Sequence, residues 1–162
     1  MANYPQLDNA SGVWNLREVY DAVMGGYWPN ANSRGLVAGG TSVAPYLKAI
    51  DSFTMASSGN ASNFGDLTTA RFSVGGMGSF TRGVFGGGYT GSNSDVLDYV
   101  TFSTEGNAAD FGNMTAAYDL PAPVSNSIRG VLAGGHPGSS PVNVIQYITL
   151  ASTGNATDFG DL

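Results

Sequence analysis

Few residues in this chain could carry chemistry. The sequence has one histidine, His136, and no cysteine. Disulfides, thiolate metal ligands and cysteine nucleophiles are therefore excluded, and a serine–histidine–aspartate system could form only around His136. This histidine stands in the polar segment HPGSSPVN, where an exposed loop position is the simplest interpretation. We therefore predict no catalytic residue and no enzymatic activity.

Carboxylates recur in pairs, which glycosidase chemistry would need. The pairs are Asp51/Asp98, Asp66/Asp161 and Asp110/Asp158. Each pair falls at equivalent positions of a repeat, so turn bonding within the scaffold explains these residues better than a unique active site does. The segment 90–98 offers Asn93, Asp95 and Asp98, but it lacks the glycine and the terminal glutamate of an EF-hand. We predict no metal site and no cofactor.

These residues belong to a repeat that fills most of the chain. Three segments open alike, with RGLVAGG at 34–40, RGVFGGG at 82–88 and RGVLAGG at 129–135, and their arginines are spaced 48 and 47 residues apart. Each opening precedes a variable polar loop, a strand-like segment and a coda such as STGNATDFGDL. We predict repeats at 34–81, 82–128 and 129–162, the third cut short, after a leader at 1–33.

Each repeat has the pattern of one β unit. The opening is a short apolar run before a glycine pair, as expected of a buried strand whose backbone closely approaches a neighbour. The next strand-like segment is apolar on both faces, and Gly-Asn at 59–60, 106–107 and 154–155 predicts a tight turn. The fold class is therefore predicted to be all-β.

Two residue types recur in phase and are predicted to serve the scaffold. They are the arginines Arg34, Arg82 and Arg129 and the coda aromatics Phe64, Phe111 and Phe159. The phenylalanines are expected to pack between repeats. For the arginines, bonds to carbonyls or to a carboxylate of a neighbouring copy, such as Asp66 or Asp161, are favoured over a ring that binds an acidic ligand.

Binding is predicted at the variable loops, because loops carried on a rigid scaffold commonly carry function. The loops are 41–49, 89–96 and 136–144, and they should cluster on one face. We predict that Tyr46, Tyr89 and His136 stack against sugars there.

The leader follows a different pattern. Asn15 and Glu18 form a capping-box pattern, apolar residues follow at helical spacing, and Gly25-Gly26 supplies a C-cap. A short amphipathic helix is predicted at about 16–24, with Trp14 and Trp28 on either side.

Composition narrows the class of protein. Net charge is −6 and charged residues make up 11% of the chain, so no basic stripe exists to bind nucleic acid. No apolar run approaches the length of a membrane span, and no secretion signal is visible in the first residues. We therefore expect neither nucleic-acid binding nor membrane insertion.

The repeat resembles the kelch repeats of β-propellers. The similarity lies in the glycine pairs, in an aromatic-bearing strand (matched here as Phe53, Tyr99 and Tyr147) and in the coda phenylalanine, where kelch repeats usually carry tryptophan. It covers residues 34–162 and implies kelch-like blades, two complete and one partial. A propeller usually needs four to eight blades, so copies of the chain, a longer chain or the leader would have to complete it.

This variant of the repeat also looks like that of structural proteins of tailed phages, marine and cyanobacterial phages especially. The resemblance implies a virion component, such as a tail fibre, an adhesin or a capsid or neck decoration. Its partners would be copies of itself, other virion proteins and a host-surface glycan. The alternative is a free carbohydrate-binding propeller that acts as a lectin.

Overall fold

The computed structural model describes residues 17, 34–41, 43–55, 57–138 and 140–162. The chain divides into two compact units, residues 1–33 and 34–162. The predicted helix at about 16–24 and both tryptophans lie outside the described residues, apart from the exposed Arg17. That helix therefore stays a prediction.

The described part of the second unit consists of three antiparallel sheets. The first holds β1 (Arg34–Gly40), β2 (Leu47–Thr54) and β3 (Ser62–Asp66) in chain order. The second holds β4 (Gly75–Gly78), β5 (Arg82–Gly86), β6 (Val96–Thr101) and β7 (Ala109–Asn113). The third holds β8 (Ala122–Ser125), β9 (Arg129–Ala133), β10 (Val144–Thr149) and β11 (Thr157–Asp161). The all-β prediction is confirmed for these residues.

The sheets are out of phase with the sequence repeat. Strand β4 comes from the last segment of the first repeat but pairs with β5, which opens the second. In the same way β8 pairs with β9 of the third repeat. The third sheet is consequently four-stranded, whereas the first has three strands among the described residues. The sequence pattern instead predicts that the incomplete unit is the third repeat, at 129–162.

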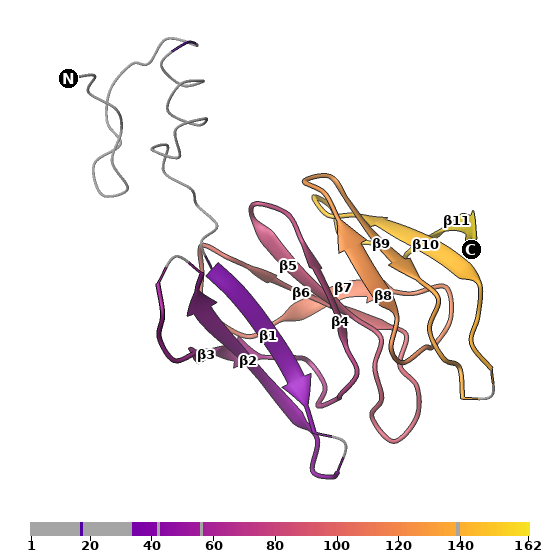
Figure 1. Cartoon of the computed structure of the whole chain (residues 1–162), viewed down its shortest axis with the longest axis horizontal. Coiled ribbons are helices and arrows are strands. Elements are labelled where there is room, and N and C mark those ends of the chain that lie inside the picture. The colour runs from indigo at the N-terminus through magenta and orange to yellow at the C-terminus, as the bar shows by residue number, and fades with distance from the viewer. Residues whose placement is uncertain (1–16, 18–33, 42, 56, 139) are drawn as a thin grey trace. The chain divides into compact units, whose positions relative to one another are not determined.

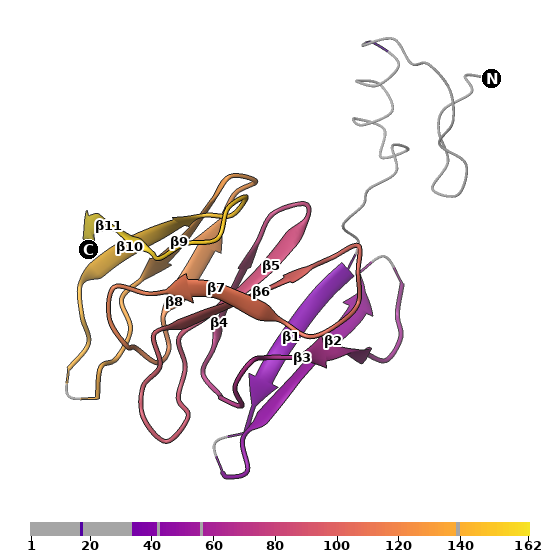
Figure 2. The same cartoon turned by 180° about the vertical axis from the view of Figure 1, so that it is seen from behind.

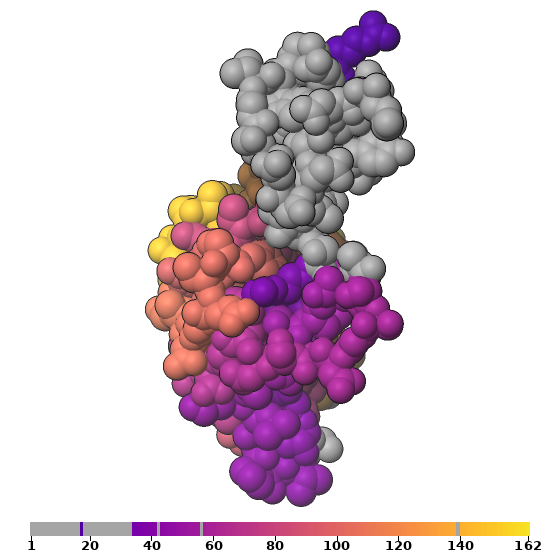
Figure 3. Space-filling model, turned by 90° about the vertical axis from the view of Figure 1, so that its left-hand side faces the viewer, coloured from indigo at the N-terminus to yellow at the C-terminus, as the bar shows by residue number. Residues whose placement is uncertain are grey.

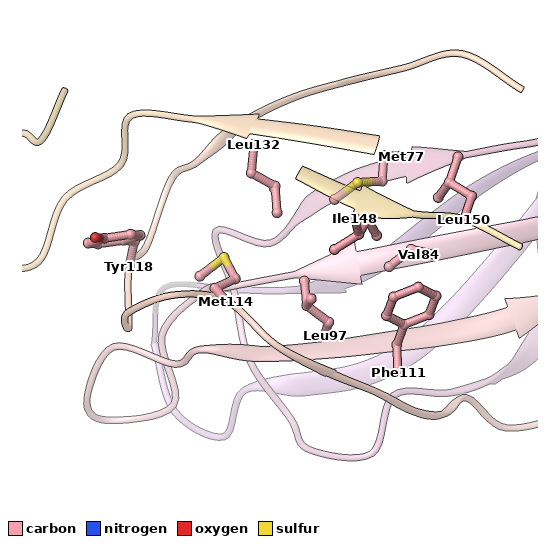
Figure 4. Close-up of a cluster of buried hydrophobic side chains, with 9 residues drawn as sticks. All are labelled: Met77, Val84, Leu97, Phe111, Met114, Tyr118, Leu132, Ile148 and Leu150. Carbon is pink, nitrogen blue, oxygen red and sulfur yellow. The ribbon is translucent and has the colours of Figure 1, made fainter. Parts of the chain in front are cut away.

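The sheets lie side by side in chain order, the second between the other two (Figure 1, and from behind in Figure 2). Two apolar cores separate them. Ile50, Phe64 and Leu67 of the first sheet and its coda pack against Phe85 and Val100 of the second. Figure 4 shows the other core, where side chains of the second sheet and its coda point toward those of the third. Its members are Met77, Val84, Leu97, Phe111, Met114, Tyr118, Leu132, Ile148 and Leu150.

A β-bulge at the Phe-Gly dipeptide of the coda recurs in every sheet. In the second sheet, Leu97 pairs with Gly112 and Asp98 with Asp110, so Phe111 is the extra residue. The same shift occurs between β2 and β3 and between β10 and β11. A bulge bends the strand and redirects a side chain, and here it accompanies a buried Phe111 ring between two sheets.

The glycine after that phenylalanine receives the neighbouring sheet. A Cβ at Gly112, whose φ is +144°, would lie 2.5 Å from the carbonyl oxygen of Gly154. A Cβ at Gly65 would likewise collide with the carbonyl oxygen of Gly106. The tight turn predicted at Gly-Asn is therefore wrong for the second and third copies. The hydrogen-bonded turns there lie earlier, at Thr101–Thr104 and Thr149–Ser152, and the Gly-Asn segments instead contact the outermost strand of the preceding sheet.

One sequence match within the strand-like segments is wrong. Phe53 pairs across the sheet with Gly35, whereas Tyr99 pairs with Val84. Tyr147 pairs with Val131, as Tyr99 does with Val84. Phe53 therefore occupies the position of Val100 and Ile148, and Ser52 stands where the other two sheets have tyrosine. The error arose because similar residue types were matched one position out of register, and a shift of one residue changes the face of a strand.

Within the residues that the structure describes, no helix has the length and apolar character to cross a membrane.

Candidate functional site

Tyr46 and Tyr89, which the sequence predicts as binding residues, lie together in the structure. Tyr46 precedes β2 and Tyr89 follows β5. Their ring centroids are 6.4 Å apart, and the ring of Phe72 contacts both, with its centroid 5.2 Å from that of Tyr46 and 5.5 Å from that of Tyr89. All three residues are half-buried. We call Tyr46, Phe72 and Tyr89 the aromatic cluster.

Backbone bonds hold the aromatic cluster in place. The N–H of Phe72 donates to the carbonyl of Tyr89 at 3.2 Å, and the N–H of Tyr89 donates to the carbonyl of Phe72 at 2.9 Å. These two bonds attach Tyr89, which follows β5, to the segment that precedes β4. Phe72 was missed in the sequence because its residue type does not recur: the equivalent position of the second copy holds Asp119, which makes the matching bridge.

His136 repeats the position of Tyr89 in the third sheet. It exchanges backbone hydrogen bonds with Asp119, at 2.9 and 3.2 Å, and its carbonyl accepts from Asn93 Nδ2 at 2.8 Å. Asn93 belongs to the loop that follows Tyr89, so the two loops touch. No ring contact between His136 and the aromatic cluster occurs among the described residues.

The imidazole of His136 contacts the loop that follows it. Its Nδ1 accepts from the N–H of Gly138 at 3.2 Å. Asp119 Oδ1 lies 3.9 Å from the same nitrogen, which is too long for a hydrogen bond. The histidine and the carboxylate are therefore neighbours, and the geometry gives no oriented acid–base pair.

The carboxylates named as glycosidase candidates are placed differently from one another. Asp98 is fully buried and accepts from Arg71 Nη2 at 3.0 Å and from Thr68 Oγ1 at 2.7 Å. Asp66 pairs with Lys48 at 3.0 Å. Those on the surface are Asp51, Asp110, Asp158 and Asp161. The described residues contain no group of three or more histidine, aspartate or glutamate side chains that could hold a metal ion.

Arg71 forms a buried ion pair that sequence reasoning missed. The side chains of Arg71 and Asp98 are both completely buried. Burial lowers the pKa of the Arg71 guanidinium, and the adjacent Asp98 carboxylate raises it in part. The available signal was that Arg71 is a cation of the first repeat with no counterpart in the second, where Tyr118 takes its place. This pair lies between the first and second sheets, where the N–H of Arg71 donates to the carbonyl of Leu47 and its Nη2 donates to that of Phe85.

The three recurring arginines lie on the sheets themselves. Arg82 and Arg129 stack on Tyr99 and Tyr147, at 4.7 and 4.8 Å from the ring centroids. Arg82 also donates from Nη1 to the carbonyl of Leu150 in the next sheet at 3.2 Å.

In the first sheet, Ser52 replaces the tyrosine, and Arg34 lies 5.7 Å from the centroid of Phe64. Its Nη1 pairs at 3.2 Å with Glu105, which lies in the connection between β6 and β7 of the second sheet. Arg34 and Arg82 thus each contact a neighbouring sheet, although neither uses Asp66 or Asp161, the partners named from the sequence.

The recurring phenylalanines divide into two groups. Phe64 and Phe111 are buried between sheets, whereas Phe159 is 56% exposed on the third sheet, where it still contacts the ring of Tyr147. The exposure of Phe159 is the first sign that this sheet has an uncovered face.

A comparison of the sequence with models of protein families found no match, and a comparison with curated proteins found none either. Inferences about function therefore depend on the geometry described above and on the resemblance of the repeats.

Proposed function

We propose that this chain is a non-enzymatic structural component of a larger assembly, of the kind found in phage virions, built from kelch-like blades. One observation carries the proposal: the two end sheets expose apolar side chains that correspond to buried ones in the middle of the stack. A protein that works alone rarely leaves such faces open to water. The expected partners are copies of the chain and other virion proteins, and the expected location is the virion.

The test is to locate the protein in particles. Gold-labelled antibody raised against the purified chain is applied to tailed phage particles whose genome encodes it and viewed by electron microscopy. Labelling at a regular place on the particle, absent from particles of an unrelated phage, supports the proposal. Purified particles that contain no trace of the chain by mass spectrometry would refute it.

The aromatic cluster favours a second function, which is binding of a carbohydrate such as a host-surface glycan. Tyr46, Phe72 and Tyr89 present half-buried ring surface beside polar loops, and aromatic faces with nearby polar groups suit sugar rings. This function belongs either to a virion adhesin or to a free lectin.

Glycan-array binding separates these two cases from a purely structural role. Tyr46→Ala and Tyr89→Ala are expected to reduce glycan binding at least tenfold. Phe80→Ala, which removes an exposed aromatic ring elsewhere, serves as the matched control and should leave binding unchanged. Equal binding by all three variants would remove the aromatic cluster from the proposal.

A further inference from the structure

The exposed face of the third sheet corresponds residue by residue to a face that is buried in the second. Toward the third sheet, the second sheet and its coda present the buried side chains Met77, Val84, Leu97, Phe111 and Met114. The repeat places Val124, Val131, Ile145, Phe159 and Leu162 at the equivalent positions of the third. We call these five residues the leading face.

The leading face is open to solvent. Val124 and Leu162 are 66% and 75% exposed, and Val131 and Ile145 are half-buried. A hollow of about 360 Å³ lies on this face beside Arg129. Its lining residues are Val124, Ser125, Asn126, Arg129, Val131 and Phe159.

The first sheet has the opposite kind of surface. Within the stack, each leading face is received by residues such as Leu132, Ile148 and Leu150 of the third sheet, all fully or nearly fully buried. The equivalent residues of the first sheet are Val37, Phe53 and Met55, which we call the receiving face. They are exposed by 58%, 38% and 63%. Figure 3 views the molecule from this side, where residues of the first sheet form part of the surface.

A backbone contact accompanies each internal interface. The N–H groups of Gly154 and Ala156 donate to the carbonyls of Phe111 and Asn113 at 2.7 and 2.8 Å, and Asn155 Oδ1 accepts from the N–H of Asn113 at 3.0 Å. Gly106, Asn107 and Ala108 make the same three bonds to β3.

Both halves of this contact are left open at the ends of the stack. The donor half at the first sheet, residues 59–61, is exposed, and a Cβ at Gly59 would meet nothing within 4 Å. The acceptor half at the third sheet lies around Gly160, where a Cβ would also meet nothing within 4 Å. By equivalence with the internal contact, one end offers two N–H donors and the side-chain oxygen of Asn60, and the other offers two carbonyl acceptors and one N–H donor.

We propose that a second copy of this chain covers these faces. The receiving face of one copy docks on the leading face of the other, through the same kind of interface that joins neighbouring sheets within one chain. The inference deepens the proposed function, on which it rests, by naming the two faces through which copies of the chain meet. Such a contact is heterologous, because two different surfaces meet, and heterologous contacts close into rings when the rotation allows. The described residues of two copies hold six sheets, a number within the range of closed propellers, and every leading face is then covered.

Mass measurement on paired variants tests this directly. The full chain should have twice its 16.6 kDa mass by sedimentation equilibrium. Phe159→Asp damages only the leading face and Phe53→Asp only the receiving face, so each variant alone should show no closed dimer. Mixed together, they retain one intact pair of faces and should form a one-to-one complex. Phe80→Asp is the control, because Phe80 is exposed but its repeat equivalent, Ser127, belongs to neither face.

The mixture separates a head-to-tail contact from other modes of association. If two leading faces met each other, Phe53→Asp would remain dimeric and the mixture would restore nothing, which would overturn the proposal. A wild-type chain that stays monomeric up to millimolar concentration would also overturn it. Circular dichroism verifies that each variant is folded, and Val124→Asp with Met55→Asp provides a second pair if the first is not.

Cross-linking tests the register of the contact. Asn60 and Asp161 are equivalent to Asn155 and Asn113, which are bonded inside the chain. The sequence has no cysteine, so Asn60→Cys and Asp161→Cys are the only thiols when the two variants are mixed. A disulfide-linked dimer is expected from the mixture and not from Thr104→Cys mixed with Asp161→Cys. Equal yields would contradict the proposed register.

The two proposals can fail separately. Particles that carry the chain while the purified protein stays monomeric would refute the self-docking and leave the virion role intact. A purified chain that forms the head-to-tail dimer but is absent from phage particles would refute the virion role and leave the self-docking intact.

Discussion

The interface between the first and second sheets differs from that between the second and third at its polar centre. At the interface between the first and second sheets, the Asp98 carboxylate accepts hydrogen bonds from Arg71 and Thr68, and the side chains of Asp98 and Arg71 are completely buried. At the interface between the second and third sheets, Gln146 stands in the place of Asp98 and accepts from the N–H of Thr115 at 2.8 Å, with Tyr118 in the place of Arg71. The surrounding apolar residues and the backbone contact follow one plan. The same interface therefore tolerates a charged or a neutral centre, provided that its oxygen acceptor is satisfied.

A third region extends the comparison. At the receiving face, Asp51 takes the position of Asp98 and Gln146 but is exposed. The predictions below compare a covered position with its uncovered equivalent. They are measured by urea unfolding in the Phe53→Asp background, in which a second copy cannot close the ring.

The largest effect is expected from the buried ion pair. Asp98→Ala leaves the Arg71 guanidinium buried without its counter-charge, so the free energy of unfolding should fall by about 3–5 kcal/mol. Asp51→Ala at the exposed equivalent should change it by less than about 0.5 kcal/mol. Similar losses for the two variants would show that burial at the interface is not what matters.

Restoring a neutral centre sharpens that result. The double substitution Arg71→Tyr with Asp98→Gln copies the pattern of the other interface, so it should recover most of the stability lost by Asp98→Ala, because a neutral centre leaves no unpaired charge. A double variant no more stable than Asp98→Ala would mean that the two centres are not interchangeable.

The coda phenylalanines should differ by almost as much. Phe111→Ala empties a ring site that is 2% exposed and should cost about 3–5 kcal/mol of unfolding free energy. Phe159→Ala should cost less than about 1 kcal/mol, because its ring is mostly in water already. Equal costs would indicate that the leading face is covered even in this background.

The bulge glycines isolate the effect of the neighbouring sheet. Gly112 and Gly160 have φ values of +144° and +140°, so alanine strains both backbones to the same extent. Only Gly112→Ala also drives a Cβ against the carbonyl of Gly154, and it should be less stable than Gly160→Ala by about 1–3 kcal/mol. Equal stabilities of Gly112→Ala and Gly160→Ala would show that the close approach of Gly154 to Gly112 does not exclude a side chain.

The smallest effect is expected at the Gly-Asn segments. Asn155→Ala removes the acceptor for the N–H of Asn113 and should cost about 1 kcal/mol. Asn60→Ala, with no such partner in the described chain, should be neutral in this background. In the wild-type background, Asn60→Ala should instead weaken dimer formation, which can be followed by the concentration at which the mass falls to that of one chain.

Part of the candidate site could be predicted from the sequence, because loops that follow equivalent strands emerge at one end of a repeat array. Tyr46 and Tyr89 were found in this way. Phe72 and the Arg71–Asp98 pair could not be predicted, since the residue types at positions 71 and 72 do not recur in the second copy and since both depend on contacts between different sheets. His136 follows its strand as Tyr89 does, yet its own bonds to Asp119 and Gly138 place it apart from the rings.

The sequence by itself determined the β class, the repeat and the residues that recur in it, because alternation, glycine pairs and spacing are local signals that survive without a fold. Only the tertiary structure decided that the second and third sheets begin ahead of their arginines, that the Phe-Gly dipeptide is a bulge, and that the Gly-Asn segment contacts the previous sheet. Each of these depends on hydrogen bonds and packing between strands of different units. Spacing along one strand carries no information about which neighbour that strand will meet.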